Sequence, residues 1–295
     1  MKKTIEDKIV DTTVIILLFL TLFIVVVPFL AVLSSAFESK DALLEKGMVL
    51  FPSEPTFDTF IFLFKGQIGG GKINIWLAFW NSVVRTVLGT VLSISVQLAL
   101  SYALTFRKLK FSTGVNIMLL ITMFIGGGLI PTYLLFNAMG MNNTIWPLVI
   151  LGAVSPYTVY IMRNFISRIP YSLTEAGYLD GANEVQIFVK IIFPLSLPIV
   201  ATYGLFAAVA QWNDWFNAFI FLNDEAKYPL MLVLKEIISE SGKVEAGANN
   251  PNLIKPNEAG LNCAAIVVVT LPMLMVYPFV QKYFVQGTML GSVKE

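Results

Sequence analysis

The sequence predicts an all-α membrane protein with six transmembrane helices, and three observations indicate this fold class. Of its 295 residues, 56% are hydrophobic and only 13% are charged, whereas soluble domains carry about 25% charged residues. Long apolar runs recur at the length of roughly 20 residues that a helix needs to cross a bilayer. Lys and Arg concentrate near alternate ends of these runs, as in proteins that cross a membrane repeatedly. We therefore expect one multi-pass transmembrane domain over residues 1–295.

Six segments have the length and composition of a transmembrane helix. They cover about residues 13–35, 76–105, 113–136, 145–164, 191–222 and 261–281. The first apolar stretch, from Val14 to Leu33, is longer than the roughly 7 to 15 residues of a signal peptide, so we expect an uncleaved anchor.

Basic residues set the expected orientation of these spans. They mark the amino end, the connection after the second span, the region around residue 170 and the carboxyl end, at Lys2, Lys3, Lys8, Arg107, Lys108, Lys110, Arg163, Arg168, Lys190, Lys282 and Lys294. The short connection 137–144 has none. Because basic residues favour the cytosolic side, the pattern predicts that both termini are cytosolic.

Composition excludes several classes of function. The chain has no histidine and one cysteine, Cys263, so the usual zinc, iron and copper ligand sets cannot be assembled and we expect no metal site. The same absence removes the usual general base of an enzyme. A net charge of +1 gives no indication of a nucleic-acid surface.

The loops expected outside the cell contain predicted structure and one misleading motif. Residues 51–60 have the Pro and aromatic content of a segment on the membrane surface, and 227–241 have helical spacing of apolar residues. The segment 66–73, GQIGGGKI, nearly matches a phosphate-binding loop, but Ile73 stands where a hydroxyl must hold magnesium. If the function of this protein uses ATP, a partner must therefore hydrolyse it.

A polar segment, PYSLTEAGYLDGANE at 170–184, interrupts the apolar sequence. Ser172 and Glu175 have the spacing of a capping box, which predicts a short cytosolic helix over about 172–186, between the fourth and fifth spans. Gly177 and Gly181 are four residues apart, so they would share one face of that helix. Such a face suits close packing, either against the protein's own membrane domain or in a groove of a cytosolic partner.

The string EAGYLDGANEVQIFVKIIFPLSLP resembles the cytosolic motif of binding-protein-dependent ABC importer permeases, E-A-A-x-x-x-G followed after nine residues by I-x-L-P. Gly177 replaces the second alanine of the motif, and Phe193 replaces the leucine. The resemblance implies a coupling helix that docks on an ATPase. The residues that it assigns to coupling are Glu175, Ala176, Gly177, Asp180, Gly181, Ala182 and Pro194. Two roles remain open for Glu175, as a helix cap and as a partner contact, and Glu184 is expected on a solvated face.

Segments 126–135, 212–221 and 277–295 extend the resemblance to the carbohydrate branch of these permeases, in particular the Lpl-type and maltose-type second permease. The family implies a subunit of the bacterial cytoplasmic membrane that is not itself an enzyme and holds no cofactor. It implies a second permease, two ATPase subunits that bind ATP and Mg²⁺, and an extracellular binding protein that delivers the carbohydrate.

Polar residues inside spans are the candidates for the sugar path, because such residues are costly in lipid. They cluster in the fifth span at Gln211, Trp212, Asn213, Asp214, Trp215 and Asn217. Interhelical hydrogen bonding and interfacial anchoring would explain the same residues. Weaker candidates are Asn81, Arg85, Gln97 and Asn116, and an ion pair between Arg85 and Asp214 is one possible contact between spans.

Two other functions compete with the importer subunit. A stand-alone ion-coupled carrier would use Asp214 and Arg85 for coupling, but it leaves the cytosolic motif unexplained. A membrane-embedded enzyme is disfavoured by the missing histidine and the scarcity of paired carboxylates inside spans.

Overall fold

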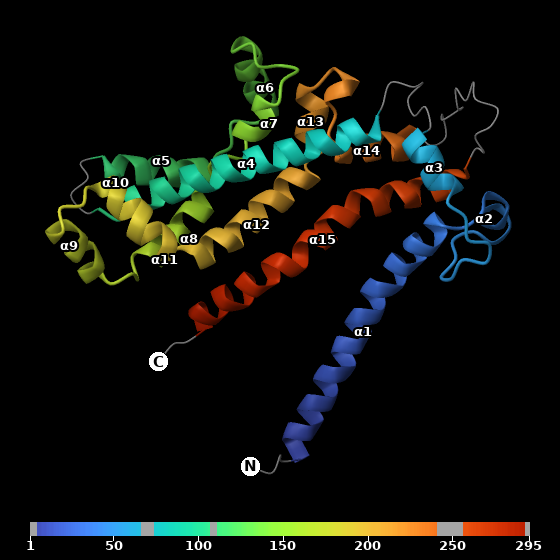
Figure 1. Cartoon of the computed structure of the whole chain (residues 1–295), viewed down its shortest axis with the longest axis horizontal. Coiled ribbons are helices and arrows are strands. Elements are labelled where there is room, and N and C mark those ends of the chain that lie inside the picture. The colour runs from blue at the N-terminus through green and yellow to red at the C-terminus, as the bar shows by residue number, and fades with distance from the viewer. Residues whose placement is uncertain (1–4, 66–73, 107–110, 241–255, 293–295) are drawn as a thin grey trace. The chain divides into compact units, whose positions relative to one another are not determined.

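A computed structural model describes residues 5–65, 74–106, 111–240 and 256–292. These residues form helices and, apart from an isolated antiparallel bridge between Glu38 and Pro55, no strands, which confirms the all-α prediction. The Gly-rich segment 66–73 lies outside the described residues. The chain divides into two compact units, Met1–Ile75 with Leu234–Leu271 and Trp76–Val233 with Pro272–Glu295 (Figure 1).

The first unit begins with the long apolar helix α1 (Ile5–Ala36). It contains the predicted first span, and its 30 residues Asp7–Ala36 are long and apolar enough to cross a membrane. Most of its large apolar side chains are exposed, as in Phe19 (70%) and Phe23 (66%). A helix that is apolar all round needs an apolar environment, which a bilayer supplies.

Glu38 lies between α1 and the short helix α2 (Lys40–Lys46). The loop from α2 to the next short helix, α3 (Asp58–Lys65), folds back onto Glu38. The Glu38 carboxylate is 0% exposed and accepts hydrogen bonds from the backbone N–H groups of Ser53 (2.6 Å), Glu54 (2.7 Å) and Ser39 (3.2 Å). Burial opposes ionisation, but these donors outweigh it and lower the pKa of Glu38. The segment 51–60 is therefore tied back to the end of α1.

The second unit is built around α4 (Ile75–Ala103), the counterpart of the predicted second span. It continues through α5 (Ser112–Phe124), α6 (Leu129–Ala138), α7 (Trp146–Ile150), α8 (Pro156–Ile166), α9 (Tyr171–Leu179), α10 (Glu184–Ile187), a π-helix (Phe188–Ile192), α11 (Phe193–Leu195), α12 (Leu197–Asn213), α13 (Phe216–Phe221) and a 3-10 turn (Glu225–Lys227). Two helices contribute residues to both units: α14 (Leu230–Glu240), which confirms the helix predicted over 227–241, and α15 (Glu258–Ser292), which includes the predicted sixth span.

The third, fourth and fifth predicted spans are each broken into shorter helices. The third stops after α5 and restarts as α6 at Gly128, whose φ is +79°. The fourth divides before Pro156, and the fifth bends by 79° between α11 and α12. Within the described residues, three helices alone are long and apolar enough to cross a membrane, or four if the bent pair is counted as one span. Average hydropathy is insensitive to such breaks, because Gly and Pro interrupt a helix without making it polar.

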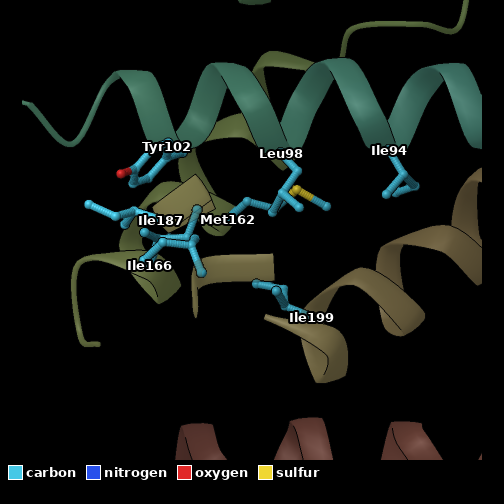
Figure 2. Close-up of a cluster of buried hydrophobic side chains, with 8 residues drawn as sticks. Ile94, Leu98, Tyr102, Met162, Ile166, Ile187 and Ile199 are labelled. Carbon is cyan, nitrogen blue, oxygen red and sulfur yellow. The ribbon is translucent and has the colours of Figure 1, made fainter. Parts of the chain in front are cut away.

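The side chains of α4 anchor the largest apolar cluster described in the second unit. Figure 2 shows Ile94, Leu98 and Tyr102 directed from α4 toward residues of α8, α10 and α12. The buried members of this cluster are Ile94, Leu98, Tyr102, Met162, Ile166, Ile187, Ile192 and Ile199. The cluster thus joins α4 to the helices on both sides of the predicted coupling segment.

A polar stripe runs along the buried face of α4. Its members are separated by three, four or eight residues and are Ser82, Arg85, Ser93, Gln97 and Ser101. Ser101 donates a hydrogen bond to the carbonyl of Val159 in α8 (2.9 Å), and Ser82 accepts one from the N–H of Leu230 (2.7 Å). Polar contacts of this kind hold helices together inside a membrane, so α4 is the central helix of this unit.

Candidate functional site

The predicted coupling segment forms two short helices, α9 and α10, instead of one helix over 172–186. Gly181 lies between them with a φ of +79°, a left-handed conformation that favours glycine after a helix end. A Cβ atom at this position would meet nothing within 4 Å. The prediction that Gly181 shares a helix face with Gly177 is therefore wrong, since backbone conformation explains Gly181 and the chain makes no close approach to it.

The predicted capping box between Ser172 and Glu175 is also wrong. Pro170 occupies the N-cap of α9, and no side chain caps that helix. Because α9 begins at Tyr171, Ser172 already lies inside its first turn. The capping box of this region belongs to α10, where the side chains of Asn183 and Gln186 each accept from the other's backbone N–H at 2.9 Å. Glu175 is exposed and free of the capping role.

Gly177 marks the face of α9 that packs on the protein's own core. A Cβ atom there would lie 3.1 Å from Cδ1 of Ile191 and 3.3 Å from Cγ1 of Ile187. Of the two partners left open for this glycine, the membrane domain is thus the one present. Ala182 packs partly buried on the same cluster. Glu175, Ala176, Leu179, Asp180 and Pro194 are exposed, and Leu179 reaches 89%.

A carboxylate with two tyrosine donors connects α9, α10 and α4. Glu184 accepts hydrogen bonds from the hydroxyls of Tyr178 in α9 (2.6 Å) and Tyr102 in α4 (3.1 Å). The hydrogen bond to Glu184, with burial and the carboxylate charge, raises the pKa of Tyr178 to about 12. The phenol therefore remains a donor at neutral pH. Sequence patterns assigned Glu184 to a solvated face or to a contact with basic residues of the ATPase, and did not indicate this role.

A second polar network lies nearer the other end of α4 and is built around Arg85. The side chain of Arg85 is 2% exposed and forms an ion pair with the carboxylate of Asp214, which confirms the predicted contact. It also donates to the backbone carbonyl of Asp214 (2.5 Å) and to Oε1 of Gln211 (3.2 Å). Arg85 thus binds the last turn of α12 and the residue directly after it.

The fifth span has a second break, between α12 and α13, and Asp214 connects these two helices. Its carboxylate accepts hydrogen bonds from the backbone N–H (3.0 Å) and the side-chain amide (2.9 Å) of Asn217 in α13. Gln211 fits against Gly89 of α4, where a Cβ atom would lie 2.5 Å from its Cδ. The break between α12 and α13 is therefore held by side chains on both sides and by α4.

Comparison with known proteins decides which family has this arrangement. The polygalacturonan/rhamnogalacturonan transport system permease protein YtcP of Bacillus subtilis (strain 168) is 34% identical, over 98% of this chain and 99% of its own. The melibiose/raffinose/stachyose import permease protein MelC of the same organism is 30% identical, over 91% of each chain. The chain belongs to the carbohydrate ABC transporter permeases. No protein-family model matches the sequence.

A solved structure is also similar to this permease over nearly its whole length. It is that of a bacterial ABC transporter involved in the import of the acidic polysaccharide alginate. The similarity has a TM-score of 0.85 at 27% sequence identity and covers 96% of this chain and 99% of that one.

Two cavities of the permease adjoin the Arg85 network. The Arg85 cavity, of about 320 Å³, is lined by Arg85, Asn81, Asn143 and Lys227 among others. The Gln211 cavity, of about 250 Å³, is lined by Gln211, Asp214 and Asn217 together with Ser93. Three of the six predicted path residues therefore face a cavity, while also bonding between helices.

The other three predicted path residues lie differently. The ring of Trp212 is buried and meets the ring of Phe79 edge-on, with centroids 6.1 Å apart. Trp215 packs against Phe216 in the same way, at 5.6 Å, and Asn213 ends α12 in an exposed position. These aromatic contacts pack the chain against itself.

Sequence reasoning missed Tyr102, Tyr178, Asn143 and Lys227. The spacing of polar residues along α4 could have indicated the importance of that helix, because Ser82, Arg85, Ser93, Gln97 and Ser101 repeat at helical intervals. Of the weaker candidates, Gln97 donates to the carbonyl of Ala153 (3.3 Å), and Asn116 accepts from Arg163 of α8 (3.1 Å).

Proposed function

We propose that this permease spans the bacterial cytoplasmic membrane six times with both termini in the cytosol. The basic residues of the sequence support this orientation. The helices α1, α4 and α15 supply three crossings. The broken segments α5–α6, α7–α8 and α11–α13 supply the other three, since irregular backbone is tolerated within a membrane where it is buried in protein or lines a cavity.

Its cargo is an oligosaccharide delivered by an extracellular binding protein. The names of YtcP and MelC support a carbohydrate substrate. The Arg85 and Gln211 cavities offer amide, guanidinium and ammonium donors beside apolar walls, which suits the hydroxyl edges and ring faces of a sugar. We assign the sugar path to these two cavities, with Gln211, Asp214 and Asn217 at its wall.

The energy for transport comes from ATP, which two ATPase subunits bind with Mg²⁺ and hydrolyse. This permease pairs with a second permease, and both are bound to the ATPase subunits. The observation that carries this proposal is the exposed face of α9, with Leu179 at its centre and Glu175, Ala176 and Asp180 around it. Leu179 has the largest exposed fraction among the apolar side chains of this segment, and Tyr171, Leu173 and Val185 are exposed as well, so we assign this surface to the ATPase contact. The opposite face of α9 rests on the membrane domain through Gly177.

The carrier alternative has lost its main support. An ion-coupled carrier would need Asp214 or Arg85 available to bind an ion during transport. In the structure each is the principal partner of the other, and Asp214 also accepts two hydrogen bonds from Asn217.

A pull-down with matched leucine variants tests the proposed docking surface. Leu179→Asp places a charge at the centre of the exposed face, whereas Leu44→Asp changes a leucine on α2 that is 67% exposed. We expect Leu179→Asp to reduce recovery of an ABC ATPase, identified by its peptides, by about tenfold, while Leu44→Asp recovers as much as the wild type. Equal recovery with both variants would contradict docking through α9. Gly181 is unsuitable for this test, because any side chain there would strain the turn.

A further inference from the structure

Helix α4 is bonded at two points along its length to the chain segment that comes after α9. At its carboxyl end, Tyr102 donates to Glu184 at the start of α10. Seventeen residues earlier (102 − 85 = 17), Arg85 holds Asp214 after the end of α12. At 1.5 Å per residue these positions are about 25 Å apart along the helix. In Figure 1, α9 and α10 lie at the left end of α4 and α13 lies toward its other end.

Glu184 is held firmly within this arrangement. It is the first residue of α10, whose start is fixed by the capping box of Asn183 and Gln186. The same short helix carries Ile187, which is 0% exposed and packs in the cluster with Tyr102. The ring of Tyr102 lies 4.9 Å from that of Phe106 and 5.4 Å from that of Phe188, measured between centroids. The hydroxyl of Tyr102 is therefore positioned by packing before it reaches Glu184.

Tyr178 brings α9 into the same contact. It lies on the third turn of α9, next to the exposed Leu179, and donates to the second oxygen of Glu184. One carboxylate thus joins the candidate docking helix to α4, with one hydrogen bond on each side. Hydrogen bonds to charged groups are stronger than those between neutral groups.

We propose that Glu184 is a positioning residue that passes the movement of α9 to α4 during transport. The inference rests on the proposed function, in which an ATPase moves α9. The covalent chain alone would pass that movement to α8 and to α10–α12. The bridge Tyr178–Glu184–Tyr102 adds α4, the helix that lines the Arg85 cavity and holds the break between α12 and α13.

A cysteine reporter on α4 tests this role without knowledge of the cargo. The single native cysteine is buried, so a Cys263→Ser background leaves one introduced thiol. Ser93→Cys places that thiol on α4 in the wall of the Gln211 cavity, with little change in size. The purified complex with its ATPases, in liposomes, is labelled with a thiol reagent with and without ATP and vanadate, and the ratio of the two labelling rates is measured.

The reference protein carries the Cys263→Ser change and the introduced cysteine on α4, with no other substitution. In it we expect ATP and vanadate to change the labelling rate. Glu184→Ala and Tyr102→Phe should each reduce that change by about fivefold, and the double variant should do no worse than either single variant. Tyr178→Phe should give a similar loss, because it removes the hydrogen bond between α9 and the same carboxylate. Glu184→Gln should retain most of the change. The amide oxygen can accept a hydrogen bond from one tyrosine hydroxyl, and the amide NH2 can donate one to the hydroxyl oxygen of the other tyrosine.

Recovery of the ATPase and the thermal midpoint in detergent should stay at the reference level in all five variants, which separates positioning from folding. A full ATP-dependent change in Glu184→Ala and Tyr102→Phe would overturn the inference while leaving the proposed function intact. If the reference protein itself shows no ATP-dependent change, the coupling through α9 is wrong and the inference is wrong with it.

Discussion

The two networks on α4 are held together by different chemistry. At Arg85, opposite charges meet in a buried site, where the guanidinium is 2% exposed and three of its nitrogens are bonded. At Tyr102, a single carboxylate on an exposed helix start is bound by two neutral hydroxyls. The first network contains a charge that is costly to leave alone. The second is held by charge-assisted hydrogen bonds and contains no ion pair.

This difference indicates which part of the permease is fixed and which can move. A buried ion pair keeps its geometry, because separating the charges exposes each to a poor solvent. The two phenol hydrogen bonds of Glu184 join α9 to α4, but a shift in their geometry separates no ion pair. Movement of the coupling segment is therefore expected to begin at Glu184, with the Arg85 network moving as one body.

The largest expected effect comes from breaking the Arg85 network. Arg85→Met leaves the carboxylate of Asp214 without its cation, and breaking a buried pair costs about 3–5 kcal/mol. We expect a large fall in the thermal midpoint of the purified protein in detergent. Adding Asp214→Asn should restore much of the lost stability, because the side chain left at position 214 is then neutral. A double variant no more stable than Arg85→Met would show that the pair is not the source of the stability.

A smaller effect is expected from Gly89→Ala, which tests the network without removing a charge. The new Cβ would lie 2.5 Å from Cδ of Gln211, so the glutamine must leave its contact with Arg85. Loss of one hydrogen bond to a charged group predicts a destabilisation of about 1–3 kcal/mol. Adding Gln211→Ala to Gly89→Ala should cause little further loss of stability. If Gly89→Ala and the wild type had the same thermal midpoint, the close packing of Gln211 on Gly89 would be contradicted.

The smallest effect is expected at Gly177, near the Tyr102 end. Its Cβ would approach Cδ1 of Ile191 at 3.1 Å, the flexible end of a side chain that can move by a few tenths of an ångström. Alanine also favours a helix over glycine by about 1 kcal/mol. Gly177→Ala should therefore leave the thermal midpoint and ATPase recovery nearly unchanged. Gly177→Val, which adds branched bulk, should lower both, and similar loss in the two variants would show that this contact is as rigid as the one at Gly89.

The sequence predicted the helices that are regular and failed where the chain changes direction. The spans in α1, α4 and α15 follow from long apolar runs, and α14 follows from helical spacing. The pair of Arg85 and Asp214 could be anticipated, because two opposite charges inside spans need each other. Helices α9 and α10 could not be separated by pattern alone, since Ser172–Glu175 and Asn183–Gln186 both have capping-box spacing. The N-cap position of Pro170 and the burial of Ile187 in the core distinguish the two sites.

The π-helix Phe188–Ile192 sets the rotation of the helices that follow it in the chain. Its hydrogen bonds reach one residue further than those of an α-helix, as from the N–H of Phe193 to the carbonyl of Phe188. The segment therefore holds one residue more than a regular helix of the same length, and that residue sets the rotational phase of α11 and α12. Deleting one residue here would turn the start of α12 by about 100°, so that Ile192 and Ile199 would exchange a buried face for an exposed one.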